Sequence, residues 1–162
     1  MKSFLILVLV LTTLPSFAAE EKPVTQAEAA AVFSKAERVV MGVLQLKVNG
    51  LAFPNGTAPA TREQVLKHFL AFYAAVESKF KFTPPPAKSA PNFIKFHDAK
   101  TKQIAEKLEL LGFVDRYGPL VTSTGEGLLP DEFGDALGYF IARVAELTHM
   151  PSAKFSPYLT PG

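Results

Sequence analysis

The chain contains no cysteine and no tryptophan among its 162 residues. Without cysteine, disulfide bonds cannot stabilise the fold, and a lipid anchor on an N-terminal thiol is excluded. Without tryptophan, the side chain that most often stacks on sugar rings is missing. Stability must therefore come from an apolar core, in which the 14 phenylalanines are the most abundant aromatic residues.

An excess of one charge sign is also lacking. The sequence has 17 basic and 15 acidic residues, which gives a net charge of +2. A nucleic-acid-binding domain needs a strongly basic face, and this balance offers none. We therefore expect no nucleic-acid partner.

Only one long apolar run is present, at residues 4–11, and it follows the basic start Met1-Lys2. The small residues Ser16 and Ala18 then match the positions that a signal peptidase reads. The run is much shorter than the roughly 20 residues that span a bilayer, so no integral membrane anchor is expected. The pattern predicts a signal peptide over residues 1–18, cleaved on export to the periplasm, cell wall or cell surface.

Sequence patterns of catalytic and metal-binding proteins are missing as well. His68, His97 and His149 are scattered without metal-ligand spacing, and there is no glycine-rich phosphate loop or nucleophile elbow. We expect no enzymatic activity, no cofactor and no metal site.

Four amphipathic helices are predicted, which makes the fold class mainly α with minimal β structure in the loops. Thr25 with Glu28 and Thr61 with Gln64 each form the capping-box pattern that opens a helix, and the first of these helices is expected to run to Val48. Asp98 is expected to cap the third helix, which Gly112 ends, and Pro130 suits the first turn of the fourth.

Two stretches of the chain are alike in pattern. Each runs as a helix, a glycine, a short apolar patch, a polar loop and a second helix, over residues 19–83 and 98–148. Gln64 and Glu132, near the starts of the two second helices, lie 68 positions apart. A proline-rich strap at 84–97 separates the copies and an irregular tail follows at 149–162. Because a tandem repeat buries its apolar face against its copy, we predict a four-helix core built from the two packed repeats.

The repeat resembles the S-layer homology (SLH) domain, a helix-loop-helix module of exported bacterial proteins. The motifs Gly50-Leu51, Pro54-Asn55-Gly56-Thr57 and Thr61-Arg62 follow in the order typical of that family. In the second copy, Asp98, Leu108, Gly112-Phe113-Val114 and Pro130-Asp131-Glu132-Phe133 fit the same frame. The segment 24–28 is similar to the motif that opens the second helix, which suggests a degenerate third copy.

The resemblance implies an exported cell-envelope protein that associates non-covalently with cell-wall polysaccharide or with surface-layer proteins. It assigns ligand binding to Thr61, Arg62, Asn55 and Gly56. Gln26 and Pro130 replace the motif arginine in the other copies, and the family's helix-opening tryptophan is absent. A chain of little more than two modules could act as an accessory subunit or complete a three-module ring by pairing with another chain, and self-association is a further expectation. The alternative is a periplasmic helical module that binds a peptide or an apolar ligand in a groove lined by Phe69, Tyr73, Phe133 and Phe140.

Overall fold

The computed structural model describes residues 21–47, 49–82, 98–122 and 127–159, and it is mainly helical, as predicted. The α-helices are α1 (Gln26–Val43), α2 (Arg62–Val76), α3 (Ala99–Leu110), α4 (Pro119–Thr122) and α5 (Pro130–Thr148). Two short 3-10 helices, η1 (Glu77–Lys79) and η2 (Ser152–Phe155), complete the described elements. Within those ranges the only β feature is one isolated bridge, between Thr25 and Pro59. The predicted signal peptide (1–18) and proline strap (84–97) lie outside the described residues.

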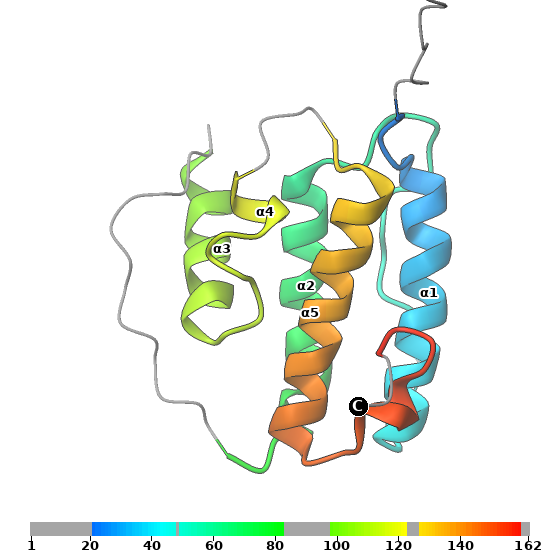
Figure 1. Cartoon of the computed structure of the whole chain (residues 1–162), viewed down its shortest axis with the longest axis vertical. Coiled ribbons are helices and arrows are strands. Elements are labelled where there is room, and N and C mark those ends of the chain that lie inside the picture. The colour runs from blue at the N-terminus through cyan, green and yellow to red at the C-terminus, as the bar shows by residue number, and fades with distance from the viewer. Residues whose placement is uncertain (1–20, 48, 83–97, 123–126, 160–162) are drawn as a thin grey trace, which may run out of the picture.

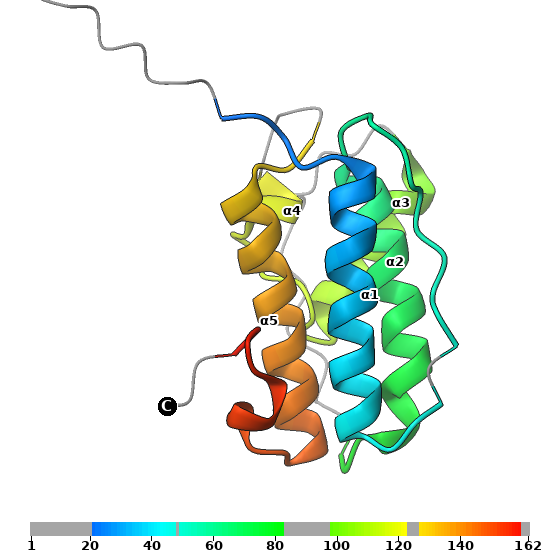
Figure 2. The same ribbon diagram turned by 90° about the vertical axis from the view of Figure 1, so that its right-hand side faces the viewer.

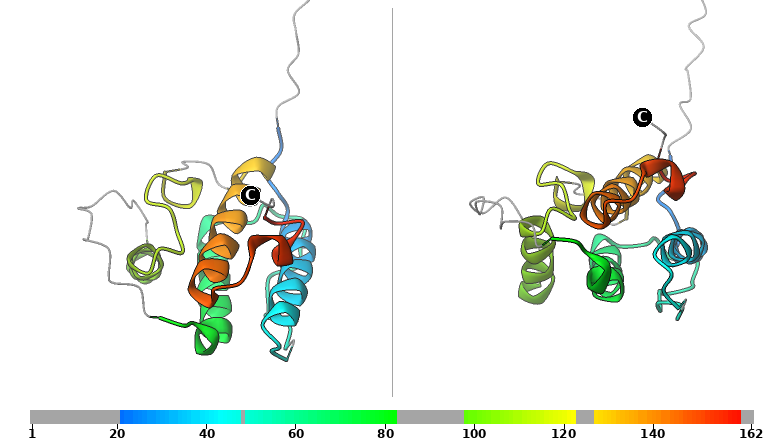
Figure 3. Two further views of the ribbon diagram at one scale, coloured as in Figure 1. Left: turned by 60° about the horizontal axis from the view of Figure 1, so that its bottom comes forward. Right: turned by 90° about the horizontal axis from the view of Figure 1, so that it is seen from below.

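The four longer helices run in the same direction, with their N-terminal ends together at the top of the molecule (Figures 1 and 2). Seen from below, α3, α2 and α1 form a row, and α5, α4 and η2 lie together on one side of that row (Figure 3). Because parallel neighbours cannot be joined by tight turns, the chain returns through long connections at 44–61, 77–98 and 111–129.

The two predicted repeats do not form separate layers, because helices of both repeats lie in the same row. Helix α3, from the second repeat, packs beside α2 of the first, while α5 covers the row. The repeats also differ in detail, since α1 has 18 residues and α3 has 12. The second repeat has the short helix α4 in its connection, and the described residues of the first connection contain no helix.

Helix starts follow the capping pattern of the sequence. The Thr25 hydroxyl accepts the Glu28 N–H at 3.2 Å, and the Glu28 carboxylate accepts the Thr25 N–H at 2.9 Å. Asp98 caps α3 by accepting the Thr101 N–H at 2.9 Å. These bonds satisfy backbone donors that have no partner inside the helix.

Left-handed residues follow the ends of α1 and α3. Gly112 has φ +76° and stops α3, as predicted. The first helix, predicted through residue 48, ends instead at Val43, because Gln45 adopts φ +54° and turns the chain.

A chain of phenylalanine rings joins the two repeats in one core. The Phe33 ring lies 5.9 Å from Phe69 and 5.1 Å from Phe133, and Phe69 lies 4.5 Å from Phe140. All four side chains are buried. Because such pairs contribute about 0.5–1.5 kcal/mol beyond burial of their area, they bind α5 firmly to α1 and α2.

The tail after α5 holds one ordered turn. Met150 and Tyr158 pack at the edge of the core, and η2 buries Phe155 completely against α1 and α5. The tail thus closes the apolar surface at the lower ends of these helices.

Candidate functional site

The openings of α1, α2 and α5 meet in a closed ring of backbone hydrogen bonds. Val24 N–H donates to the Leu128 carbonyl at 2.8 Å, Leu128 N–H to the Ala60 carbonyl at 3.4 Å, and Ala60 N–H to the Val24 carbonyl at 2.8 Å. Each residue immediately precedes the N-cap of its helix, and all three are buried. Three segments far apart in sequence therefore occupy equivalent positions around one centre.

The equivalence extends to the residues before the ring. Pro23, Pro59 and Gly127 precede Val24, Ala60 and Leu128, and they converge on one another. A Cβ on Gly127 would lie 2.8 Å from the Pro59 Cβ and 3.0 Å from the Pro23 Cβ. Only glycine fits at this third position without displacing a proline ring.

The equivalence also extends to the N-caps. Thr25 and Thr61 make complete capping boxes, with Glu28 and Gln64 respectively. At α5 the box is half made, because Leu129 has no side-chain oxygen, but Glu132 still accepts the Leu129 N–H at 2.9 Å. The segment 24–28, considered a degenerate third copy in the sequence, thus stands in the same structural role as the two clearer motifs.

Two of the predicted site residues lie at the opening of α2. The Thr61 hydroxyl accepts the Gln64 N–H at 3.2 Å, which is the cap itself. Arg62 is partly buried and its Nη1 donates to the Val121 carbonyl of α4 at 3.4 Å. Burial lowers the pKa of Arg62, and the nearby Glu132 carboxylate opposes that shift. The guanidinium, which stays charged, therefore braces α2 against α4 and α5.

The other two predicted residues lie at a different opening. The Gly56 carbonyl accepts the Ala27 N–H at 2.9 Å, and the Ala58 carbonyl accepts the Gln26 N–H at 2.9 Å. Asn55 is exposed beside them. This loop caps the N-terminus of α1, whereas Arg62 reaches towards α4, so these hydrogen bonds do not bring the four residues into one site.

A groove of about 680 Å³ lies between the openings of α1 and α5, next to the ring. Val32 and Phe133 form its apolar part, and Thr25 and Glu28 its polar edge. Its lining is Lys22, Pro23, Val24, Thr25, Glu28, Val32, Thr57, Pro59, Pro130, Phe133 and Gly134. The groove predicted for an apolar ligand, with Phe69, Tyr73, Phe133 and Phe140 together in its lining, does not form, because Phe69 and Phe140 are fully buried in the core.

A buried pair of titratable side chains, which the sequence analysis missed, joins α1 to α2. His68 Nε2 lies 2.9 Å from Glu37 Oε1, with side chains 1% and 4% exposed. Glu37 Oε2 accepts the Leu51 N–H at 3.0 Å, which ties the returning connection to the helices. The His68 ring packs 4.0 Å from Phe33 and 5.4 Å from Phe53. Burial lowers the pKa of His68, and the Glu37 carboxylate opposes the shift to a smaller extent.

No protein-family model, curated protein or solved structure shows significant similarity to the chain. Among the described helices, none is long and apolar enough to cross a membrane. In the same part of the chain, no three histidine, aspartate or glutamate side chains are grouped closely enough to hold a metal ion.

Proposed function

We propose that the chain is an exported, non-catalytic SLH-like protein of the cell envelope, which associates non-covalently with cell-wall polysaccharide or with surface-layer proteins. The ring formed by Val24, Ala60 and Leu128 carries the proposal. Three helix-opening segments that resemble one family motif come together with matched caps and matched ring residues. That is the arrangement expected if the chain derives from repeated modules of this kind.

Two surfaces beside the ring are available to a wall polymer. The groove between α1 and α5 presents apolar and hydroxyl-bearing side chains together, a combination that suits a sugar chain. Arg62, at the opening of α2, supplies the one cation at the arginine position of the motif, since Gln26 and Pro130 stand at the equivalent positions. Its positive charge attracts the acidic groups of a wall polymer.

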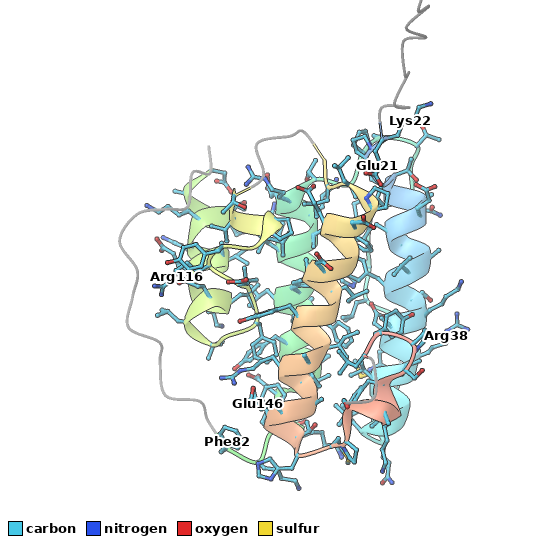
Figure 4. All side chains as sticks on the ribbon, viewed as in Figure 1. Glu21, Lys22, Arg38, Phe82, Arg116 and Glu146 are labelled. Atoms are coloured by element: carbon cyan, nitrogen blue, oxygen red, sulfur yellow. The ribbon has the colours of Figure 1, made fainter. Side chains whose placement is uncertain are left out.

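The test is cosedimentation of the purified protein with cell-wall sacculi. Gly134 lines the groove on α5, and a Cβ there meets nothing within 4 Å, so Gly134→Phe should fill the groove without disturbing the backbone. Gly134→Ala is its matched control. Arg62→Ala is compared with Arg38→Ala, which removes an exposed arginine from α1 (Figure 4).

We expect the wild type to sediment with sacculi, and Gly134→Phe to reduce the bound fraction severalfold with a melting temperature no lower than that of the wild type. Arg62→Ala should also reduce the bound fraction, compared at a temperature where the variant is folded, because loss of the contact with the Val121 carbonyl should lower its melting temperature. The two controls should bind as the wild type does. A wild-type protein that stays in solution with sacculi, and with sacculi carrying their surface-layer proteins, would contradict the proposal.

A further inference from the structure

A separate pocket of about 300 Å³ lies between α5 and the connection that precedes and includes the start of α4. Its floor is apolar and buried, formed by Phe113, Val114, Leu120 and Ala136. Asp115, Tyr117, Asp135 and Tyr139 complete its walls and rim, together with Gly118 and Pro119. None of these residues belongs to the ring of helix openings or to the groove beside it.

Two exposed tyrosines flank this pocket. Tyr117 is 73% exposed and Tyr139 is 44% exposed, and they are two of the three large hydrophobic side chains that the described residues expose to this degree. A single water-exposed aromatic ring is ordinary, but two such rings that line one concavity favour an interaction site.

The pocket is also acidic. Asp115 and Asp135 are both exposed at its edge, and none of the residues lining it is a cation. Two arginines lie beside the tyrosines, and each is paired with a carboxylate outside the pocket. Arg116 interacts with Tyr117, and its Nε lies 2.8 Å from Glu109. Arg143 acts on Tyr139, and its Nη1 lies 2.6 Å from Glu146. Arg116 lies beside α3, and Glu146 lies at the lower part of α5 (Figure 4).

The backbone holds one wall of the pocket in place. Asp115 Oδ1 accepts the Tyr117 N–H at 3.1 Å, and the Asp115 carbonyl accepts the Gly118 N–H at 3.0 Å. This turn presents the Tyr117 ring and the Asp115 carboxylate from the same short segment. From the other wall, α5 presents Tyr139 and Asp135 four residues apart, on one face of a helix.

We propose that this pocket binds an organic ammonium group, held against the tyrosine rings and balanced by the carboxylates of Asp115 and Asp135. Tyrosine faces attract cations through their quadrupole, and carboxylates add direct charge complementarity. The apolar floor accommodates the methyl or methylene groups that such a cation carries. The ammonium can belong to a small amine or to a lysine side chain of a partner protein. This inference is independent of the wall association proposed above.

The test is an NMR titration of the full chain at low ionic strength, followed through the backbone amides. Choline is the probe, and its neutral carbon isostere 3,3-dimethylbutan-1-ol is the control, because the two have nearly the same shape and differ in charge. A short lysine-containing peptide forms the second arm and N-acetylglucosamine the third.

We expect choline or the lysine peptide to shift the amides of residues 113–120 and 135–139, and the neutral isostere to bind at least about tenfold more weakly than choline. Binding by choline would point to a small amine, and binding by the peptide alone to a protein partner. Equal binding of choline and its isostere would overturn the inference, as would shifts outside these segments. Shifts in the pocket with N-acetylglucosamine alone would also overturn it.

Variants separate the contribution of the tyrosine ring to binding from that of the carboxylate. Tyr117→Ala should weaken binding about two- to fivefold, whereas Tyr117→Phe keeps the ring and should bind as the wild type does. Asp135→Asn should weaken it about threefold, as expected for one exposed charge pair. Its matched control is Asp131→Asn, which removes the same charge one turn earlier on α5 outside the pocket. Equal losses for the two asparagine variants would show only a general charge effect and contradict the assignment.

Discussion

At the scale of single residues, the most unusual feature is the buried contact between Glu37 and His68. Each side chain stands on the apolar face of its helix, since Glu37 follows Phe33 by four positions and His68 precedes Phe72 by four. A titratable residue on such a face was a signal available in the sequence. What the sequence could not supply was the partner, because the contact depends on two helices that pack side by side.

The pair predicts strong coupling between two substitutions. His68→Leu should lower the free energy of unfolding by about 3–5 kcal/mol, because it leaves the buried Glu37 carboxylate uncompensated. Glu37→Leu should lower it by about 1–3 kcal/mol, because the neutral His68 ring and the Leu51 N–H lose their acceptor. The double variant should lose clearly less than the sum of the two, because it buries apolar groups in place of both. Urea denaturation of the four proteins measures this. Additive losses would mean that the two side chains do not depend on each other.

His68 also predicts how stability depends on pH. In the unfolded chain His68 titrates near its ordinary pKa of 6.5, and in the fold its pKa is lower. Between these values the unfolded chain binds more protons, so the free energy of unfolding should fall as the pH drops below about 6.5. The decline from this residue should level off below the folded-state pKa.

Chemical denaturation from about pH 7.5 to pH 5 tests this dependence on protonation. His68→Gln should remove part of the slope in that window, while His149→Gln, at the end of α5, should keep it. A wild-type protein that becomes more stable as the pH falls through this window, with a slope that His68→Gln does not change, would contradict the buried neutral histidine.

At the scale of secondary-structure elements, the helices and their caps could be predicted, but their packing could not. Thr25, Thr61 and Asp98 cap the helices that the sequence assigns to them, because capping depends on residues only two or three positions apart. The end of α1 was missed since it depends on left-handed Gln45, a residue type that gives no signal for that conformation. The parallel course of the helices was missed because long connections leave direction open.

Gly127 predicts a stability effect at the ring of helix openings. Gly127→Ala should destabilise the fold by about 1–3 kcal/mol, because the new methyl group meets two proline rings and the Ala60 carbonyl, which lies 3.3 Å away. Gly134→Ala, an open site within α5, should instead stabilise it by about 0.5–1 kcal/mol. Thermal unfolding compares the two, and a harmless Gly127→Ala would argue against the close approach of the three openings.

At the scale of the whole molecule, one chain closes its own ring. Val24, Ala60 and Leu128 of the same chain form it, and pairing with another chain stays a prediction. The candidate site residues Thr61 and Arg62 could be chosen from a local motif, yet their hydrogen bonds point into the fold. The groove combines segments more than a hundred positions apart, and the acidic pocket combines segments about twenty positions apart. Such surfaces follow from tertiary packing alone.

Native-state hydrogen exchange of the amides of Val24, Ala60 and Leu128 tests most directly whether the three openings form one unit. If each N–H is held by the carbonyl of the next opening, all three should exchange with a common free energy close to that of global unfolding. The value should not change with protein concentration, and Gly127→Ala should lower it equally at all three. Three unrelated exchange rates, or protection that rises with concentration, would contradict a ring closed within one chain.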